Sequence, residues 1–199
     1  MDSTGWDQRY STSDYIWNAG PNEFVAEHLA AFRPGTAIDL AAGEGRNAVW
    51  LAERGWEATA VDFSPVGLQK AERLAADRGV AIDVQVGDVT TWEPAGPVDL
   101  VVIAYLQLPV QQQVDVLQRA VSWVRPGGTV FVVAHDRTNV EHGYGGPPDE
   151  AVCYDLDRTV AALEGLDVRL AEVAERHVEK DDGHHVALDT LVIARAPAA

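Results

Sequence analysis

The sequence is short of cysteine and of positive charge. Cys153 is the only cysteine in 199 residues, which excludes an internal disulfide and a thiolate metal cluster; we expect it to pack rather than to catalyse. The chain has 15 lysines and arginines against 31 acidic residues, and its formal net charge is −16. Such a surface repels phosphate backbones and anionic lipids. We therefore expect a small-molecule substrate and neither nucleic acid nor a membrane as partner; the oligomeric state stays open.

The sequence also lacks long hydrophobic runs. No window reaches the length of a membrane span, and the acidic, polar stretch Met1–Gly5 does not resemble a secretory signal. With so little cysteine, these features favour a cytoplasmic protein. The length and the 47% hydrophobic content suit one domain over residues 1–199.

What the chain does have is an alternation of β-rich runs and helical patterns from Thr36 onward. This rhythm predicts an α/β fold with a doubly wound, mostly parallel, Rossmann-like sheet. The turn Asp181-Asp182-Gly183 predicts that the last two strands form an antiparallel hairpin. The expected strands cover residues 37–40, 57–62, 82–86, 100–104, 130–134, 168–177 and 186–194.

Helix signals lie between these strands. Ser64-Pro65 predicts a helix start and Gly79 its end, and a short helix is expected over 157–163. Another helix should end before Pro126, with an apolar face made of Val110, Val114, Leu117, Val121 and Val124.

Residues 1–35 form an aromatic-rich segment, with a helix expected near Asn22. We expect its aromatic side chains to cover either the sheet edge, as a strap, or the ligand site, as a lid. These side chains are Trp6, Tyr10, Tyr15 and Trp17. Under the second interpretation, Tyr10 and Trp17 line the substrate pocket.

A glycine-rich turn follows the first expected strand, in the run Asp39–Ala48. It lets a ligand approach the backbone closely at the edge where doubly wound sheets bind nucleotides. Asp62, at the end of the second strand, can accept hydrogen bonds from ribose hydroxyls. Asp88, at the end of the third, can receive the exocyclic amine of adenine.

Glycine spacing alone does not choose the ligand, because Gly43, Gly45 and Ala48 also satisfy the dinucleotide fingerprint. A pyrophosphate favours a site without nearby anions, yet Glu44 lies inside the turn and Asp39 at its base. Carboxylates suit the ammonium and sulfonium of S-adenosylmethionine (SAM). An NAD(P)-dependent oxidoreductase and a non-catalytic SAM-binding protein remain the alternatives.

These motifs resemble those of class I SAM-dependent methyltransferases over residues 37–195. The resemblance implies a seven-stranded sheet with an antiparallel last strand, and SAM as cofactor. Ala41 stands where that family usually has glycine. The candidate cofactor residues are Asp39, Ala41, Gly43, Gly45 and Asn47 around the methionine part, Asp62 and Phe63 near the ribose, Asp88 and Val89 at the adenine, and Ala104 and Tyr105 beside the methyl group.

A narrower resemblance concerns Trp6-Asp7, Tyr10, Pro21-Asn22 and the run Gly43–Ala48. These residues are similar to the tellurite-resistance and thiopurine methyltransferase-like group. This resemblance implies acceptors that are chalcogen oxyanions or small molecules bearing sulfur.

The acceptor side is expected at the carboxyl ends of the strands, where the fifth strand delivers His135. An oxygen or amine acceptor needs a general base, and His135 is the candidate; an anionic sulfur or selenium acceptor needs none. Arg46 is expected to pair either with an anionic acceptor or with a surface acid.

Two further segments could reach the same side. The Gly/Pro-rich loop 141–148 would cover the acceptor pocket, with Tyr144 as its wall, unless it is a plain surface loop. If the sixth strand runs parallel to the others, its hairpin brings His177, His184 and His185 near His135. We expect His184 to lie near the pocket and no metal to be bound, because histidines in a charged turn are more often solvated than ligands.

Overall fold

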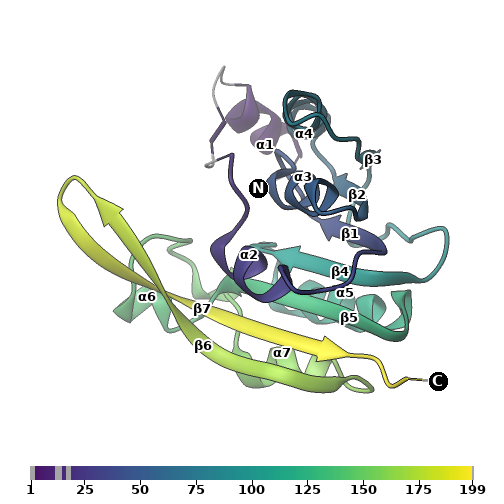
Figure 1. The fold of residues 1–199 in the computed structure, drawn as a ribbon. Coiled ribbons are helices and arrows are strands. Elements are labelled where there is room, and N and C mark those ends of the chain that lie inside the picture. The colour runs from purple at the N-terminus through teal and green to yellow at the C-terminus, as the bar shows by residue number, and fades with distance from the viewer. Residues whose placement is uncertain (1–2, 12–14, 17–18, 199) are drawn as a thin grey trace. The chain divides into compact units, whose positions relative to one another are not determined.

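The computed structural model describes residues 3–11, 15–16 and 19–198, and the chain divides into two compact units, Met1–Ala104 and Tyr105–Ala199. None of the described helices is long and apolar enough to cross a membrane. The strands follow the order β3-β2-β1-β4-β5-β7-β6 of a seven-stranded sheet (Figure 1). The predicted α/β fold with a mostly parallel sheet and an antiparallel last strand is confirmed.

The first unit is built from parallel strands and the helices that connect them. Side chains that point from these strands into the core, such as Leu40, Val61 and Leu100, have no exposed surface. Ser64 caps the fourth helix as predicted, since its side chain accepts a hydrogen bond from the Gly67 amide. The elements are α1 (Ser3–Tyr10), α2 (Glu23–Leu29), β1 (Thr36–Leu40), α3 (Arg46–Glu53), β2 (Glu57–Asp62), α4 (Pro65–Asp77), β3 (Asp83–Val86) and β4 (Val98–Ala104).

The second unit is built around an antiparallel arrangement. β7 lies between β5 and β6 and pairs antiparallel with both, so β6 runs parallel to β5. α7 packs on β6 and β7 and also contacts α5. The elements are α5 (Val110–Trp123), β5 (Val124–His135), α6 (Asn139–His142), the 3₁₀ turn η1 (Glu150–Val152), α7 (Leu156–Ala162), β6 (Asp167–Lys180) and β7 (Gly183–Arg195).

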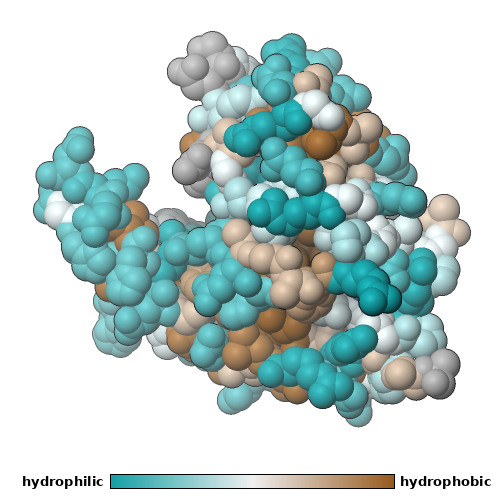
Figure 2. Space-filling model, viewed as in Figure 1, coloured by the Kyte–Doolittle hydropathy of each residue, from teal (hydrophilic) through white to brown (hydrophobic). Residues whose placement is uncertain are grey.

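The hairpin of β6 and β7 is longer than predicted. β5 pairs with β7 only over residues 189–195, whereas β6 pairs with β7 as far as Lys180 opposite Gly183. The hairpin therefore continues past β5 as a two-stranded ribbon, drawn in green and yellow in Figure 1. Side chains at the end of this ribbon are mainly hydrophilic (Figure 2).

The buried face of α5 differs from the predicted one. Gln113, Val116, Leu117, Ala120 and Trp123 are buried, whereas Val110, Val114 and Val121 are only half-buried. A polar residue can occupy this face because the Gln113 amide donates to the carbonyls of Leu108 and Val152, at 2.7 and 3.0 Å. Leu117 and Val124 of the predicted face are buried, whereas the prediction left out the buried Val116, Ala120 and Trp123.

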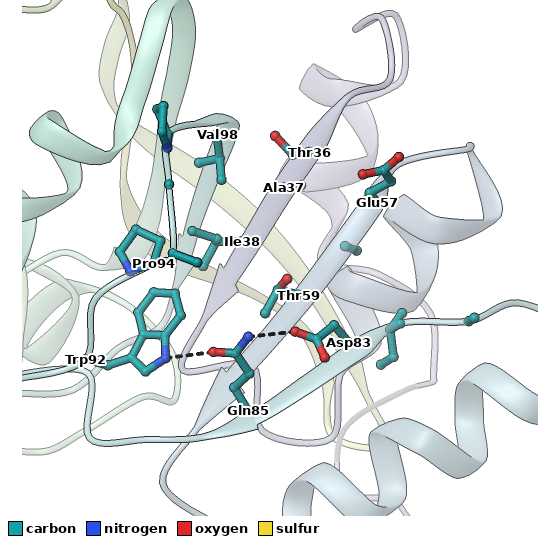
Figure 3. A pocket seen from close by; sticks show the side chains of 16 residues that line it. Thr36, Ala37, Ile38, Glu57, Thr59, Asp83, Gln85, Trp92, Pro94 and Val98 are labelled. Atoms are coloured by element: carbon teal, nitrogen blue, oxygen red, sulfur yellow. Dashed lines mark hydrogen bonds between the residues drawn. The ribbon is translucent and has the colours of Figure 1, made fainter.

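The connection between β3 and β4, residues 87–97, is fully described and contains no helix. A hollow of about 740 Å³ lies along the start of the four parallel strands, where Trp92 donates to Gln85 at 3.0 Å (Figure 3). None of the candidate site residues lines this hollow. It marks the amino ends of the strands, the edge opposite to the glycine-rich turn.

Candidate functional site

The turn after β1 has an unusual backbone. Ala41, Gly43 and Gly45 adopt positive φ angles of 61°, 55° and 75°. At Ala41 this left-handed conformation costs about 1–2 kcal/mol, because its β-carbon comes too close to the following carbonyl oxygen; glycine has no β-carbon and avoids this cost. A β-carbon at Gly45 would come within 2.3 Å of the Ala71 β-carbon on α4, so only glycine fits at the start of α3. The turn is held in a strained conformation, which is typical of functional loops.

Two buried carboxylates brace this turn. Asp39 Oδ2 accepts a hydrogen bond from the Ala48 amide at 3.0 Å. Asp62 accepts from the Gly43 amide and from the Ser64 amide, both at 2.8 Å, through its two different oxygens. Both side chains are buried, at 1% and 3% exposure. Since each carboxylate oxygen has two lone pairs, Asp62 keeps acceptor capacity for ribose hydroxyls.

The charge of the turn suits a cationic ligand. Burial raises the pKa of Asp39 to about 7, although the Ala48 amide and the positive charge of Arg46 oppose this change. Burial also raises the pKa of Asp62, against the hydrogen bonds from the Ser64 and Gly43 amides. Desolvated carboxylates gain when a positive group binds nearby, which fits the ammonium of SAM better than a pyrophosphate. Arg46, half-buried on α3, acts electrostatically on Asp39.

Glu44 does not play the part that the sequence predicted. Its carboxylate forms an ion pair with Lys70 at 2.9 Å and accepts the Ile16 amide at 2.9 Å. Both charged side chains are nearly buried. Glu44 therefore holds the N-terminal segment against the turn. Because Lys70 balances its charge, the preference of the turn for a cationic ligand comes from Asp39 at its base.

The remaining candidate cofactor residues of the first unit lie around this turn. Asn47 is buried and accepts the Asn22 amide at 2.9 Å, and Phe63 is half-buried. Asp88, just after β3, is exposed and accepts from the Thr90 amide at 2.8 Å, while Val89 is buried. Asn47 thus joins α3 to the start of α2, and Asp88 shapes the turn at the predicted adenine position.

The N-terminal segment covers the turn. The ring of Tyr10 is buried and lies against Gly43 and Gly67, and Trp6 stacks on it with ring centroids 5.4 Å apart. The Ser64 hydroxyl donates to Asp7 on α1 at 2.5 Å. Tyr15 packs against the core of α3 and α4. This arrangement is compatible with both the strap and the lid interpretation, and Trp17 lies outside the described residues.

A second cluster of polar side chains lies in the second unit, around Asp189. This residue is fully buried on β7, opposite His135 on β5. Asp189 Oδ2 accepts from the Tyr105 hydroxyl and from Arg176 Nε, each at 2.7 Å. Asp189 Oδ1 lies 3.1 Å from His135 Nδ1. Tyr105, directly after β4, has a φ of 58° and thus a strained backbone.

The cluster fixes the protonation of two of its members. Burial tends to raise the pKa of Asp189, but the contacts with His135 and Arg176 outweigh it and hold the pKa below its usual value. Burial, reinforced by the negative charge of Asp189, raises the pKa of Tyr105 far above its usual value. Asp189 is therefore an anion near neutral pH, and Tyr105 is a neutral donor. The sequence analysis missed both Asp189 and Arg176.

The loop after α6 covers His135. A β-carbon at Gly146 would come within 2.9 Å of the imidazole ring. Tyr144, two residues earlier, stacks on His185 with ring centroids 3.9 Å apart. The loop therefore contacts His135 through Gly146, whereas Tyr144 contacts the ribbon.

The histidines of the ribbon do not gather around His135. β6 does run parallel to β5, as supposed, but the register places Asp189 opposite His135, and His184 and His185 lie further along the ribbon. His184 contacts His177 at 3.1 Å and Glu179 at 2.6 Å and is half exposed. Among the residues that the structure describes, no group of three or more His, Cys, Asp or Glu side chains could hold a metal ion.

Cys153 is buried, and burial raises the pKa of its thiol to about 11. A thiol of this kind is not a nucleophile near neutral pH.

Comparison with known proteins assigns the segment that contains the braced turn. Residues 37–128 match the family described as "Methyltransferase domain". This segment, slightly less than half of the chain, is similar to methyltransferase domains. A curated relative, the 2-heptyl-1-hydroxyquinolin-4(1H)-one methyltransferase of Mycobacteroides abscessus, is 28% identical over 117 residues, which cover 57% of this chain and 52% of the relative. Other relatives are named as ribosomal RNA and tRNA methyltransferases.

Solved structures show the same fold over nearly the whole chain. TehB from Haemophilus influenzae has a TM-score of 0.74 at 14% identity, over 96% of this chain and 65% of TehB. The N-methyltransferase NodS from Bradyrhizobium japonicum, in complex with S-adenosyl-L-homocysteine (SAH), has a TM-score of 0.72 at 17% identity, over 98% of both chains. The chain spans only 33% and 52% of the length of the first two curated relatives.

Proposed function

We propose that this chain is a SAM-dependent methyltransferase that acts on a small molecule. One observation carries the proposal. The strained turn Ala41–Gly45, braced by the buried carboxylates of Asp39 and Asp62, lies inside the segment that matches the methyltransferase family.

The residues of the first unit fit the parts of SAM. Ala41, Gly43 and Gly45 expose backbone to the methionine part, and the Asp39 carboxylate at the base of the turn favours its ammonium. Asp62 has lone pairs left for the ribose hydroxyls, and Asp88 with Val89 receives the adenine. Ala104 is the last residue of β4 and lies next to the methyl group in this assignment. When bound, SAM supplies an activated methyl carbon, so the chain need only place the acceptor.

Two alternatives make different predictions. A dinucleotide would bring a pyrophosphate anion to a turn that has a buried carboxylate at its base, which is electrostatically unfavourable. A non-catalytic SAM-binding protein would bind the cofactor without turnover. The clustered polar groups around Asp189 favour an enzyme, because buried titratable groups with specific partners are common at catalytic sites.

The acceptor is proposed to be a small molecule rather than RNA. A net charge of −16 opposes binding to a phosphate backbone, even though some relatives are named for RNA. The narrower resemblance favours acceptors with sulfur or another chalcogen, whereas the relative from Mycobacteroides abscessus is named for a hydroxyquinolone.

The test compares SAH and NADH by thermal unfolding of the full chain. A ligand that binds only the folded state raises its stability, and SAH at about 100 times its Kd should raise Tm by about 5–10 °C. Asp62→Asn should lose most of this shift. Asp99→Asn is the matched control, because Asp99 also binds a backbone amide, that of Thr36 at 2.8 Å, but at the opposite ends of the strands. A shift with NADH alone, or none with SAH, contradicts the proposal.

A further inference from the structure

Strand β6 forms an edge of the sheet that no other described strand covers. It is the last strand in the order of the sheet and, among the described strands, pairs only with β7 (Figure 1). It is 14 residues long, and its stretch 170–178 contains neither proline nor lysine, two residues that commonly protect such edges. The open backbone groups of this stretch can therefore pair with a further strand.

We propose that two copies of this chain associate through the middle of β6, antiparallel to each other, with Ala174 on the two-fold axis. All residues that carry the inference belong to the second unit, and it does not depend on the proposed methyl transfer. The paired stretch 170–178 begins where a β-bulge between Val168 and Leu170 ends. Such a pair makes one continuous sheet from the sheets of the two copies.

Charge complementarity supports a second copy as the partner. With Ala174 on the axis, Glu172 lies opposite Arg176 of the second copy, and symmetry makes this pair occur twice. Side chains directly opposite each other have β-carbons about 4.5–5.5 Å apart, so opposite charges there stabilise the pairing and like charges oppose it. Leu170 also lies opposite Val178 of the second copy. The edge is therefore complementary to itself.

Neighbouring registers lose this match. An axis at Val173 leaves Glu172 opposite Ala174, and an axis between those two residues, Val173 and Ala174, places Glu172 opposite Glu175. An axis between Ala174 and Glu175 leaves Arg176 opposite Val173, and an axis at Glu175 places this residue opposite its own copy. Like charges and unpaired charges both disfavour these registers, so the sequence of the strand favours the axis at Ala174.

Arg176 can join this contact without leaving Asp189. Its Nε donates to Asp189 Oδ2 at 2.7 Å, and its side chain keeps 21% exposure. A guanidinium has five N–H donors, so its terminal groups can also donate to a carboxylate. Glu172 is exposed and makes no ion pair with the described residues. Within one chain, Glu172 and Arg176 are about 13 Å apart along the strand, so Glu172 cannot reach this arginine without a second copy.

The pairing also gives the protruding ribbon a neighbour. β5 leaves β7 at Asp189, which lies opposite Ala174, so β6 continues from Glu175 onward in a two-stranded part. In the proposed pair, residues 175–178 of this part lie beside residues 170–173 of the second copy. The ribbon then has three strands, the number that a sheet commonly needs for stability. Val173, which is 40% exposed, lies diagonally across the axis from its own copy and becomes partly covered.

Sedimentation of the full chain over about 1–500 μM measures the association. The mass should rise with concentration from 21.5 kDa toward twice that value. Glu172→Arg places arginines opposite each other and should weaken the association about tenfold or more. Glu72→Arg is the matched control, because Glu72 is exposed on α4 and undergoes the same change of charge away from the edge. A mass that stays at 21.5 kDa throughout, or equal weakening by both variants, overturns the inference.

Cysteine cross-linking tests the register. Ala174→Cys brings two thiols together at the axis, with the Cα separation that a disulfide needs. Ala171→Cys leaves the two thiols about 20 Å apart, because each lies opposite His177 of the second copy. Under mild oxidation the first variant should form a covalent dimer and the second should not; the native Cys153 is buried in both. Equal cross-linking of the two variants, or none of Ala174→Cys, overturns the inference, and neither readout depends on SAH.

Discussion

The Tyr10 hydroxyl lies over Gly43, where a β-carbon would come within 2.6 Å of its oxygen. The contact joins α1 to the turn after β1. Gly67 on α4 also lies close to the ring, since a β-carbon at Gly67 would come within 3.2 Å of the ring's Cδ2. Glycine at position 43 therefore serves both the positive φ of the turn and the close packing of the N-terminal segment.

Gly43→Ala should displace Tyr10 and weaken SAH binding at least tenfold, because the new methyl group occupies the position of the hydroxyl. Gly79→Ala is the matched control. Gly79 also has a positive φ, 69°, but its β-carbon would meet no atom within 4 Å. It should lose about 1 kcal/mol of stability and no affinity. Calorimetric titration with SAH measures the affinity of each variant. Equal affinities would mean that Tyr10 moves aside without affecting SAH binding.

The buried Asp39 predicts a pH-dependent stability. Its pKa is about 7 in the folded chain against an ordinary value of 3.8. The folded state therefore holds this proton more tightly than the unfolded chain, and the stability from this group is present at low pH and falls as the pH rises from about 4 to about 7. Asp62 acts in the same direction.

Asp39→Asn should remove this loss while keeping an oxygen for the Ala48 amide. The Tm of the variant should rise relative to the wild type between about pH 5 and pH 8. A constant Tm difference across that range would show that Asp39 does not titrate there.

The ion pair of Glu44 and Lys70 predicts an asymmetric response to substitution. Lys70→Met removes the cation beside a buried carboxylate, which should cost about 3–5 kcal/mol of unfolding free energy. The double variant Glu44→Gln, Lys70→Met leaves no buried charge and should recover most of that loss. Urea unfolding of the wild type and the two variants measures these losses, and equal losses in the single and double variants would contradict a desolvated pair.

The fold could be predicted because local signals agree with one another. β2 begins and ends where the sequence placed it, at Glu57 and Asp62, and α4 follows its Ser64-Pro65 start. β5 is longer than predicted. The final hairpin is also longer, because the pairing of β6 with β7 continues through charged residues that break an apolar pattern. Helix α1 was missed because its polar residues give no strong helical face.

The site could be predicted only in part. The turn Ala41–Gly45 was found because glycine spacing is a local signal. Glu44 was misread, because its partner Lys70 is 26 residues away on α4 and nothing local links the two. Asp189 and Arg176 lie within strands. The register of β5 and β7 places Asp189 opposite His135, and Arg176 on β6 contacts Asp189. An acidic residue at position 189, just before an apolar run at the end of β7, was the one available signal.

Among the described strands, none pairs with the ribbon of β6 and β7 beyond β5. Two strands alone are marginally stable in water, so this part can open without disturbing the buried strand pairs around Val192. Its amide hydrogens should therefore exchange faster than those between β5 and β7. Asp189, whose carboxylate lies near His135, is the residue of β7 at which the ribbon leaves β5.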